Sequence, residues 1–511
     1  MKEEIIGFDG QNADTLDRPH RARARCSPVV GLGLALLLLP VPRAFAGDRD
    51  DREGLRPSPR DVHDPGPRGG APGAGKPIDG LTDTERQLFK EGLFRATELE
   101  ATCDTCSDVP PGTPIPPGSP PDTTNSAGLG GRFNSDQCVA CHSHPALGGT
   151  SPAINPSFAI AARKGATNRV PFFESLNGPT REVRFLFNED GTRDGSVHQK
   201  FTVKGRSDAP LCRLEQPDFE AASEKYGLGF RIPTPLFGLG LVDSIPDIEI
   251  RAHLNSNLER KARLGIHGTP NLVGNNSTIG RFGWKAQNAS ITVFAGEAYN
   301  VEMGITNELF PISKTEDETC NLGAEPNDVT RVDDPKFDNP LELMADWLMF
   351  SLFTRFLDAP QPVALSRTAE RGFHLFEEVG CSECHVPSMK TRPAPRGPLS
   401  GALAGKTVNL FSDLVVHHMG ANLADNVIQG GAGPDQFRSA PLWGVGQRLF
   451  LLHDGRTSDL QEAIRAHYSE ASEAHDRDPA YPASEANQVI IQYSRLSSTE
   501  QQDILDFLRS L

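Results

Sequence analysis

The sequence has no excess of positive charge and almost no long apolar run. Lysine and arginine number 51 against 67 aspartate and glutamate residues, so the formal net charge is −16. Such a chain is poorly suited to bind nucleic acid or an anionic membrane surface. Outside residues 29–39, no segment approaches the length of a membrane helix, which needs about 20 apolar residues. We therefore predict no nucleic-acid partner and no stable membrane span.

The short apolar run at residues 29–39 has the flanks of an export signal. Four arginines precede it, and a small-x-small cleavage sequence follows at residues 44–46. This order is typical of a secretory signal peptide. We therefore predict a signal peptide over residues 1–46 and a periplasmic or otherwise exported protein. The alternative is an uncleaved anchor.

Two copies of the pentapeptide Cys-x-x-Cys-His are the most informative feature of the chain. They occupy residues 138–142 and 381–385. This spacing attaches a c-type haem, because the two thiols form thioethers to the porphyrin and the adjacent histidine ligates the iron. We predict two covalently bound c-type haems, with structural zinc as the alternative. The predicted attachment and ligand residues are Cys138, Cys141 and His142 in the first copy and Cys381, Cys384 and His385 in the second.

Cysteine is otherwise scarce, with nine residues in the whole chain. Cys26 falls in the predicted signal peptide, so the cysteines outside the haem motifs are Cys103, Cys106, Cys212 and Cys320. An even number in an oxidising compartment predicts up to two disulfides. Cys103 and Cys106 form a Cys-x-x-Cys pair without a following histidine, which argues against a third haem. The alternatives to a disulfide there are a redox-active pair or a four-cysteine zinc site with the first haem motif.

Capping signals locate several helices. Residues 82–85 and 497–500 are capping boxes, in which a Thr or Ser and a Glu three residues later satisfy the first free backbone groups of a helix. They predict helices that end near Glu98 and at Leu511. A similar helix is expected to start near Ser366.

The order of a helix followed by a haem motif occurs twice, which indicates a duplicated cytochrome c-like unit. We predict a mainly α fold with long loops and short strands between Val183 and Val203. An apolar helix over residues 341–357 lies at or near the expected domain boundary. The predicted organisation is a signal peptide at 1–46, a disordered linker at 47–80, an N-terminal haem domain at 81–340 with a Pro-rich insertion at about 100–127, and a C-terminal cytochrome c-like haem domain at 341–511.

Short motifs of a known family recur over most of the mature chain. They include Phe-Arg-Ile-Pro-Thr-Pro at 230–235, Phe-Gly-Trp-Lys at 282–285, Glu-Met-Gly-Ile-Thr-Asn at 302–307, His-His-Met-Gly at 417–420, Pro-Leu-Trp-Gly at 441–444 and His-Asp-Gly-Arg at 453–456. With these motifs the chain resembles the di-haem oxidoreductases, also called thiol oxidoreductase-like proteins. That family is related to bacterial di-haem cytochrome c peroxidases and to the di-haem enzyme that matures methylamine dehydrogenase. The thiol label has no support in this chain, because no free reactive cysteine is indicated.

The resemblance implies a second axial ligand for the C-terminal haem. In the family this ligand lies fourteen residues after the histidine of His-Asp-Gly, which is His453 here, so that His467 takes the position. Bis-histidine ligation lowers the potential of a haem relative to His/Met ligation. The alternatives are Tyr468, Met419 or Met389 as the ligand, with His467 a solvent-facing helix residue.

The resemblance also implies two residues with catalytic roles. Trp284 matches the tryptophan that lies between the haems, and Glu302 matches the acidic residue of the open pocket. Glu302 is then a general acid/base for breaking an O–O bond. The alternatives are a core aromatic for Trp284 and a helix-end carboxylate for Glu302. His198 is an alternative distal ligand of the first haem.

One departure from the peroxidases concerns calcium. They bind it between the haems with a threonine and a proline, and Arg448 and Phe450 stand at those positions here, so calcium is doubtful. The sequence as a whole predicts an exported, peroxidase-like di-haem c-type oxidoreductase. Its reactive haem is on His142, its electron-transfer haem is on His385 and His467, and its partner is a small, basic redox protein. The alternatives are a pure electron-transfer di-haem cytochrome and a di-haem oxygenase.

Overall fold

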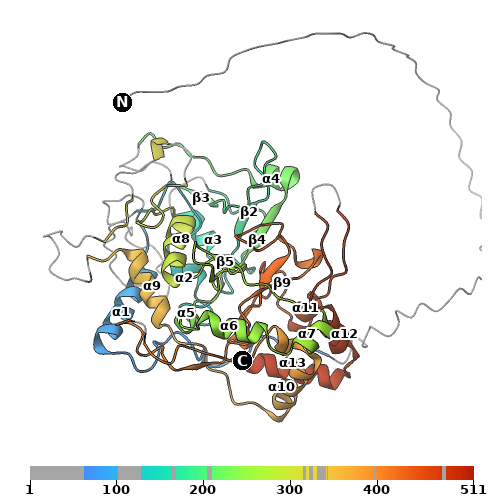
Figure 1. Ribbon diagram of the computed structural model, residues 1–511. Coiled ribbons are helices and arrows are strands. Elements are labelled where there is room, and N and C mark those ends of the chain that lie inside the picture. Colours follow the sequence, from blue (N-terminus) through green and yellow to red (C-terminus); the bar gives the residue numbers. More distant parts are fainter. Residues whose placement is uncertain are drawn as a thin grey trace, which may run out of the picture. The chain divides into compact units, whose positions relative to one another are not determined.

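Helices make up most of the regular structure in the computed structural model (Figure 1), with 33% of the described residues helical and 11% in strands. The prediction of a mainly α protein is therefore confirmed. The structure describes residues 62–101, 128–163, 168–203, 210–314, 318–320, 326–330, 341, 343–395, 397–474 and 479–511. The predicted signal peptide, Cys103, Cys106 and most of the predicted insertion lie outside these residues. Among the described helices, none combines the length and apolar character that crossing a membrane requires.

The α-helices of the described chain are short. They are α1 (Asp83–Thr97), α2 (Cys138–Cys141), α3 (Ser157–Arg163), α4 (Phe219–Tyr226), α5 (Leu239–Asp243), α6 (Asp247–Leu254), α7 (Leu258–Leu264), α8 (Ile291–Met303), α9 (Asp346–Phe356), α10 (Arg367–Val379), α11 (Leu460–Arg465), α12 (Asn487–Arg495) and α13 (Ser498–Ser510). Long loops connect them, as the glycine and proline content predicts.

The strands of the described chain form five two-stranded antiparallel ladders, β1–β3, β2–β4, β5–β6, β7–β8 and β9–β10. The strands are β1 (Arg132–Phe133), β2 (Glu182–Phe185), β3 (Phe201–Thr202), β4 (Leu228–Arg231), β5 (Leu272–Val273), β6 (Thr278–Ile279), β7 (Met389–Lys390), β8 (Thr407–Val408), β9 (Val416–His418) and β10 (Gln436–Arg438). Two of them, β2 and β3, fall in the region where the sequence predicts strands. Their partners β4 and β1 lie outside that region.

Capping residues set the starts of the long helices, as predicted. Thr82 accepts a hydrogen bond from the Glu85 amide, and the Glu85 carboxylate accepts one from the Thr82 amide at 2.8 Å, which completes the capping box of α1. Ser497 and Glu500 form the same box at α13, and Ser366 is the N-cap of α10. The apolar helix predicted over residues 341–357 starts later than expected, since α9 spans Asp346–Phe356.

Close crossings of two helices occur in both halves of the described chain (Figure 1). In the first, α1 packs on α9, and a Cβ added at Gly92 would lie 2.3 Å from the Met349 carbonyl oxygen. In the second, α10 packs on α13, and a Cβ added at Gly372 would lie 1.8 Å from the Asp503 carbonyl oxygen. Only glycine permits backbones to approach this closely. The repeated crossing supports the predicted duplication.

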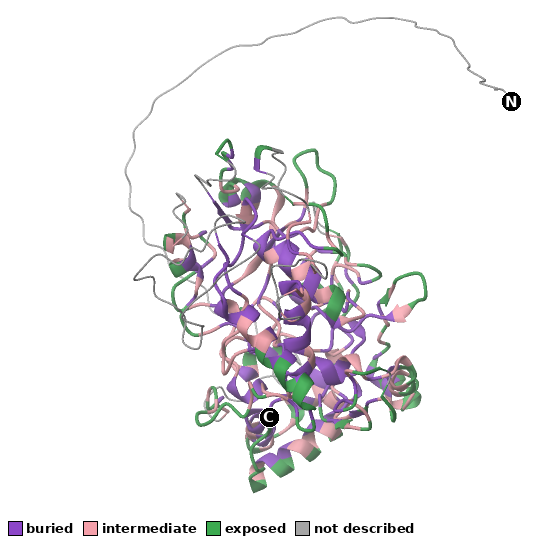
Figure 2. Ribbon diagram, turned by 90° about the vertical axis from the view of Figure 1, so that its left-hand side faces the viewer, coloured by how far each residue is buried: buried purple, intermediate pink, exposed green. Residues whose placement is uncertain are grey.

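Two hydrophobic cores surround these crossings, and Figure 2 shows the buried residues that form them. The larger core includes α1, α5, α8 and α9, and the smaller one includes α10, α12 and α13. Phe89 and Phe353 lie 5.4 Å apart between ring centroids in the first, and Phe376 and Phe507 lie 5.4 Å apart in the second. Because α9 packs with the first core, it belongs structurally with α1. The domain boundary at residues 340 and 341 stays a prediction.

The structure corrects the predicted disordered linker over residues 47–80 in its described part, 62–80. Asp64 is buried, pairs with Arg509 and accepts a hydrogen bond from the Leu460 amide at 2.7 Å. The Ile78 amide donates to the Phe356 carbonyl at 2.8 Å. Composition predicts disorder here because it cannot reveal a partner such as Arg509, which lies 445 residues away in the sequence.

One of the two possible disulfides lies within the described chain. Cys212 and Cys320 are linked, closing a loop of 108 residues in sequence separation. Their sulfurs lie with Leu214 in a small buried cluster.

Candidate functional site

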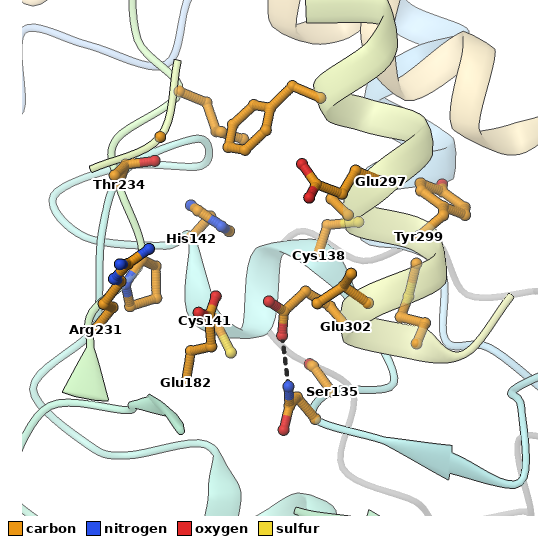
Figure 3. Close-up of a pocket in the computed structure, with 18 of the residues that line it drawn as sticks. Ser135, Cys138, Cys141, His142, Glu182, Arg231, Thr234, Glu297, Tyr299 and Glu302 are labelled. Atoms are coloured by element: carbon orange, nitrogen blue, oxygen red, sulfur yellow. Dashed lines mark hydrogen bonds between the residues drawn. The ribbon is translucent and has the colours of Figure 1, made fainter. Parts of the chain in front are cut away.

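The first Cys-x-x-Cys-His motif forms one wall of a cavity (Figure 3). The single turn of α2 places the thiols of Cys138 and Cys141, three residues apart, on the same side. His142 follows as the C-cap, and its ring N–H at Nδ1 donates to the Gly149 carbonyl at 3.0 Å. Burial lowers the pKa of His142 to about 4. The side chain is therefore a neutral imidazole with Nε2 available, which is the form that binds a metal.

Helix α8 supplies another wall of this cavity. Figure 3 shows Glu297 and Glu302 pointing from α8 toward the space beside His142. Ser290 caps the start of the helix, and Gly304 ends it in the left-handed conformation that glycine adopts readily. The helix boundaries thus place Glu302 in the last turn, facing the haem-binding motif.

Glu302 has the environment of a neutral carboxyl group. Its Oε2 accepts one hydrogen bond, from the Asn134 side-chain amide at 2.9 Å. Burial and the negative charge of Glu182 raise the pKa of Glu302 to about 8. The nearby ammonium of Lys200 is already paired with Glu174 at 2.6 Å. A protonated carboxyl that lines a cavity is able to deliver a proton there.

The second Cys-x-x-Cys-His motif lines another cavity, in the C-terminal half. His385 donates from Nδ1 to the Phe411 carbonyl at 3.1 Å, and His467 lines the same cavity. His467 donates from Nδ1 to the Ala463 carbonyl at 2.8 Å, near the end of α11. Burial, followed by the nearby His467, lowers the pKa of His385 to about 4. The structure therefore brings together the two histidines that the sequence predicts as ligands.

The alternative ligands of the second cavity are less well placed, with one exception. Tyr468 is 36% exposed, and its hydroxyl donates to Glu470. Met389 is buried in the first core and does not line the cavity, whereas Met419 does line it. Met419 is therefore the alternative that remains within the site.

His198 does not line the first cavity. Its Nε2 lies 2.6 Å from an Asp194 carboxylate oxygen, and its ring stacks on Phe185 with centroids 3.8 Å apart. These contacts occupy the side chain away from His142. The alternative of His198 as a distal ligand has no geometric support.

Trp284 lines both cavities. Its indole N–H donates to the Ile232 carbonyl at 2.9 Å, and the ring meets His453 edge to face with centroids 6.4 Å apart. A side chain shared by the two cavities is a physical bridge between them. The position agrees with the role that the family resemblance implies.

Sequence reasoning did not assign a role to Lys285, which follows the bridging tryptophan. Its ammonium is fully buried and donates to three main-chain carbonyls between Gly433 and Gln436. It also pairs with Asp425 at 3.0 Å and lies 4.1 Å from the Phe437 ring centroid. The lysine thereby ties the segment of Trp284 to a loop beside the second cavity. The Phe-Gly-Trp-Lys motif was the available signal.

His417 is a second residue of the site that the sequence analysis did not single out. It lines the second cavity, and its two ring nitrogens lie 2.9 Å from Glu485 and 3.0 Å from Asp413. All three side chains are buried. The His-His-Met-Gly motif signalled this segment, but only the fold brings the two carboxylates to it.

Comparisons with known proteins agree with this geometry at the level of the family. The family described as "Di-haem oxidoreductase, putative peroxidase" matches residues 194–495. The match includes Trp284, Glu302, His467 and the second haem motif, and it starts after the first. No curated protein matches the chain.

Two solved structures are similar at low levels. A MauG-like protein associated with microbial copper homeostasis is 18% identical, with a TM-score of 0.22 over 35% of this chain and 55% of that one. The alignment thus spans about half the length of that protein. Hydrazine synthase of Kuenenia stuttgartiensis is 13% identical, with a TM-score of 0.27 over 94% of this chain and 100% of that one. Scores this low do not establish a shared fold.

Proposed function

Because this chain belongs to the di-haem oxidoreductase family, we propose that it is a peroxidase-like enzyme with one covalently attached c-type haem in each of its two cavities. The observation that carries the proposal is the repeated arrangement of the cavities. Each is lined by two cysteines and the histidine that follows them, and each such histidine is fixed through Nδ1 by a main-chain carbonyl. Fixing one ring nitrogen in this way orients the other toward a metal.

The polar lining of the second cavity fits an anionic group as large as haem. Arg438 and Arg448 line this cavity, and neither forms an ion pair with a carboxylate within the described chain. Burial lowers the pKa of each guanidinium to about 10, which shows how costly these unneutralised charges are. The two propionates of a haem would supply the negative charge that Arg438 and Arg448 lack.

The residues divide the chemistry between the cavities. When bound, the haem iron supplies a centre that reacts with peroxide in the first cavity and a store of one electron in the second. His385 and His467, which line the same cavity, would hold the second iron. Glu302 holds a proton on its carboxyl in the first cavity, and this proton would serve the cleavage of a peroxide O–O bond there. Asn134 keeps that carboxyl in place.

Trp284 is the proposed electron route between the cavities. It contacts both, and the hydrogen bond to Ile232 fixes the plane of its indole. The electron donor is a small, basic redox protein, since the chain has a net charge of −16 before the propionates are counted.

Export is part of the proposal. Covalent haem attachment consumes free thiols, and the Cys212–Cys320 disulfide persists in oxidising compartments. Both features favour the periplasm or another exported location, in agreement with the predicted signal peptide over residues 1–46.

One observation favours a second candidate function, a pure electron-transfer cytochrome. Met303 lines the first cavity beside Glu302. A thioether from Met303 on the first iron would close the position that peroxide needs.

Ligand binding to the purified holoprotein separates the two functions. Cyanide added to the oxidised protein is expected to shift the absorption of one haem and leave the other unchanged. Hydrogen peroxide is expected to be consumed when a reduced basic cytochrome is supplied. A protein in which neither haem binds cyanide and peroxide is not consumed would establish the electron-transfer cytochrome instead.

A further inference from the structure

A cluster of buried carboxyl groups lies where α1 ends and α9 begins, outside both cavities. Glu98 is the C-cap of α1, Glu100 follows it, and Asp346 is the first residue of α9. Their exposed fractions are 1%, 1% and 2%. One oxygen from each lies within 4.8 Å of the others. The end of α1 and the start of α9 are far apart in the sequence, and the fold brings three acidic side chains together where they meet.

Within the described part of the chain, the ion pairs of this cluster are made with Arg95. Arg95 lies 3.1 Å from Asp346 and 3.3 Å from Glu91, but its distance to Glu98 is 3.9 Å, which is too long for a hydrogen bond. A further buried carboxyl, that of Asp328, accepts hydrogen bonds from the main-chain amides of Asp346 and Trp347, each at 3.0 Å. One guanidinium therefore faces several buried acids.

Glu98 is the member of the cluster that points to a missing ligand. Both of its carboxylate oxygens are buried, and neither accepts a hydrogen bond from the described residues. Burial, together with the charge of Asp346, raises the pKa of Glu98 well above its usual value. A buried carboxyl that accepts no hydrogen bond from the described residues, and has only the Arg95 guanidinium at 3.9 Å, is stabilised by a proton or a further cation.

We propose that Glu98, Glu100 and Asp346 bind a calcium ion. Carboxylate oxygens are hard ligands, which suit calcium or magnesium rather than zinc or copper. Oxygens that share a calcium ion lie at most roughly 4.6–5.2 Å apart, and one oxygen from each of the three carboxylates lies within 4.8 Å of the others. Calcium is also commonly held by several protein oxygens, whereas magnesium usually keeps several of its waters. Water and main-chain carbonyls complete its coordination.

This site differs in place and residues from a calcium site between the haems. It lies beside the first haem motif, to which two hydrogen bonds connect it. The Glu100 amide donates to the Asp136 carbonyl at 2.9 Å, and the Gln137 side chain donates to the Thr97 carbonyl. Calcium here would brace the α1–α9 crossing against the segment that carries Cys138.

Metal analysis of the complete holoprotein tests the proposal. After dialysis against a calcium buffer and then against metal-free buffer, we expect one calcium ion per chain, removable with EGTA. Calcium added to the EGTA-treated protein is expected to raise its melting temperature, because the ion binds only the folded state. Absence of both bound calcium and the shift in melting temperature would overturn the proposal.

Variants locate the ion. Glu98→Gln keeps the shape of the side chain and is expected to weaken calcium binding in a titration by at least about tenfold, since ligand charge sets affinity. Glu91→Gln is the matched control, because it removes an Arg95 partner outside the ligand set, and its affinity should equal that of the wild type. If the Glu98→Gln variant does not fold, Glu100→Gln is the second ligand variant, with the same expected loss of affinity. Wild-type affinity in the ligand variants would place the ion elsewhere and overturn the proposal. If Glu98 is instead a protonated acid, Glu98→Gln will be as stable as the wild type, and calcium will change the stability of neither.

Discussion

His385 and His467 line the same buried cavity, and each donates its Nδ1–H to a main-chain carbonyl, of Phe411 and Ala463 respectively. The two hydrogen bonds fix the tautomer of both rings and leave both Nε2 atoms for a metal. Two neutral imidazoles fixed in this way, in a cavity that also holds two cysteines, are the ligand set that the proposed low-spin c-type haem would use.

Replacing His467 with alanine is expected to convert one low-spin haem to high spin. The haem itself should remain, because His385 and the two thioethers still hold it. Electron paramagnetic resonance of the oxidised protein measures the change. Tyr468→Phe is the control, since Tyr468 is partly exposed and its hydroxyl contacts Glu470. A low-spin signal that survives in His467→Ala but disappears in Met419→Leu would assign the ligand to Met419.

Replacing Glu302 with glutamine is expected to slow peroxide turnover by roughly 10²–10⁴-fold, the usual contribution of a positioned acid or base. Cyanide binding and the absorption spectrum should change little, because glutamine keeps the size of the side chain. Stopped-flow absorption after mixing with hydrogen peroxide measures the rate. Turnover at the wild-type rate would reduce Glu302 to a structural residue.

The pH dependence of turnover gives an independent test of the same residue. The pKa of Glu302 is raised to about 8, so its carboxyl is protonated below that pH and loses its proton above it. If the acid form is the active one, wild-type turnover should fall as the pH rises through about 8. The Glu302→Gln variant should lack this step. A profile that is the same in both proteins would assign the titration to another group.

Replacing Trp284 with phenylalanine is expected to slow electron transfer between the haems while the first still reacts with peroxide. The smaller ring loses the hydrogen bond to Ile232 and part of its contact with the two cavities. Stopped-flow spectra that resolve the two haems separate these steps. Trp347→Phe is the control, because Trp347 lies in α9 and lines neither cavity. Equal rates in the wild type and Trp284→Phe would remove the tryptophan from the electron route.

Replacing Gly372 with alanine is expected to lower stability by about 1–3 kcal/mol, the usual cost of overpacking. Elsewhere within a helix this substitution stabilises by about 1 kcal/mol, so the sign of the effect reports the contact between α10 and α13. Denaturation monitored by circular dichroism measures it. Gly397→Ala is the control, because an added Cβ meets no atom within 4 Å there. A stabilised Gly372→Ala variant would contradict the close crossing.

Local signals in the sequence predicted the parts of the structure that depend on neighbours in the chain. Thr82 and Ser497 cap their helices as predicted, because a capping box is complete within four residues. The haem motifs are equally local, since one turn of α2 brings Cys138 and Cys141 together. His467 was predicted through a family spacing, and the fold then brought it to His385.

Features that depend on distant pairing were not predictable. Asp64 meets Arg509 across 445 positions, which converts part of a low-complexity segment into an ordered one. Two further examples are the main-chain carbonyls that accept hydrogen bonds from Lys285 and the carboxyl groups of Asp346 and Glu98, which lie close together. In both, only the fold brings the elements concerned together. Composition and periodicity describe each of these residues alone, whereas burial and charge balance belong to the assembled molecule.

Intact-mass spectrometry of the purified exported protein tests the central claim most directly. The account predicts a mass that exceeds that of the polypeptide by two haems under denaturing conditions, because thioether bonds survive unfolding. Cys138→Ala with Cys141→Ala should remove one haem, and Cys381→Ala with Cys384→Ala should remove the other. A wild-type mass equal to that of the polypeptide alone, with no covalent haem, would contradict the account.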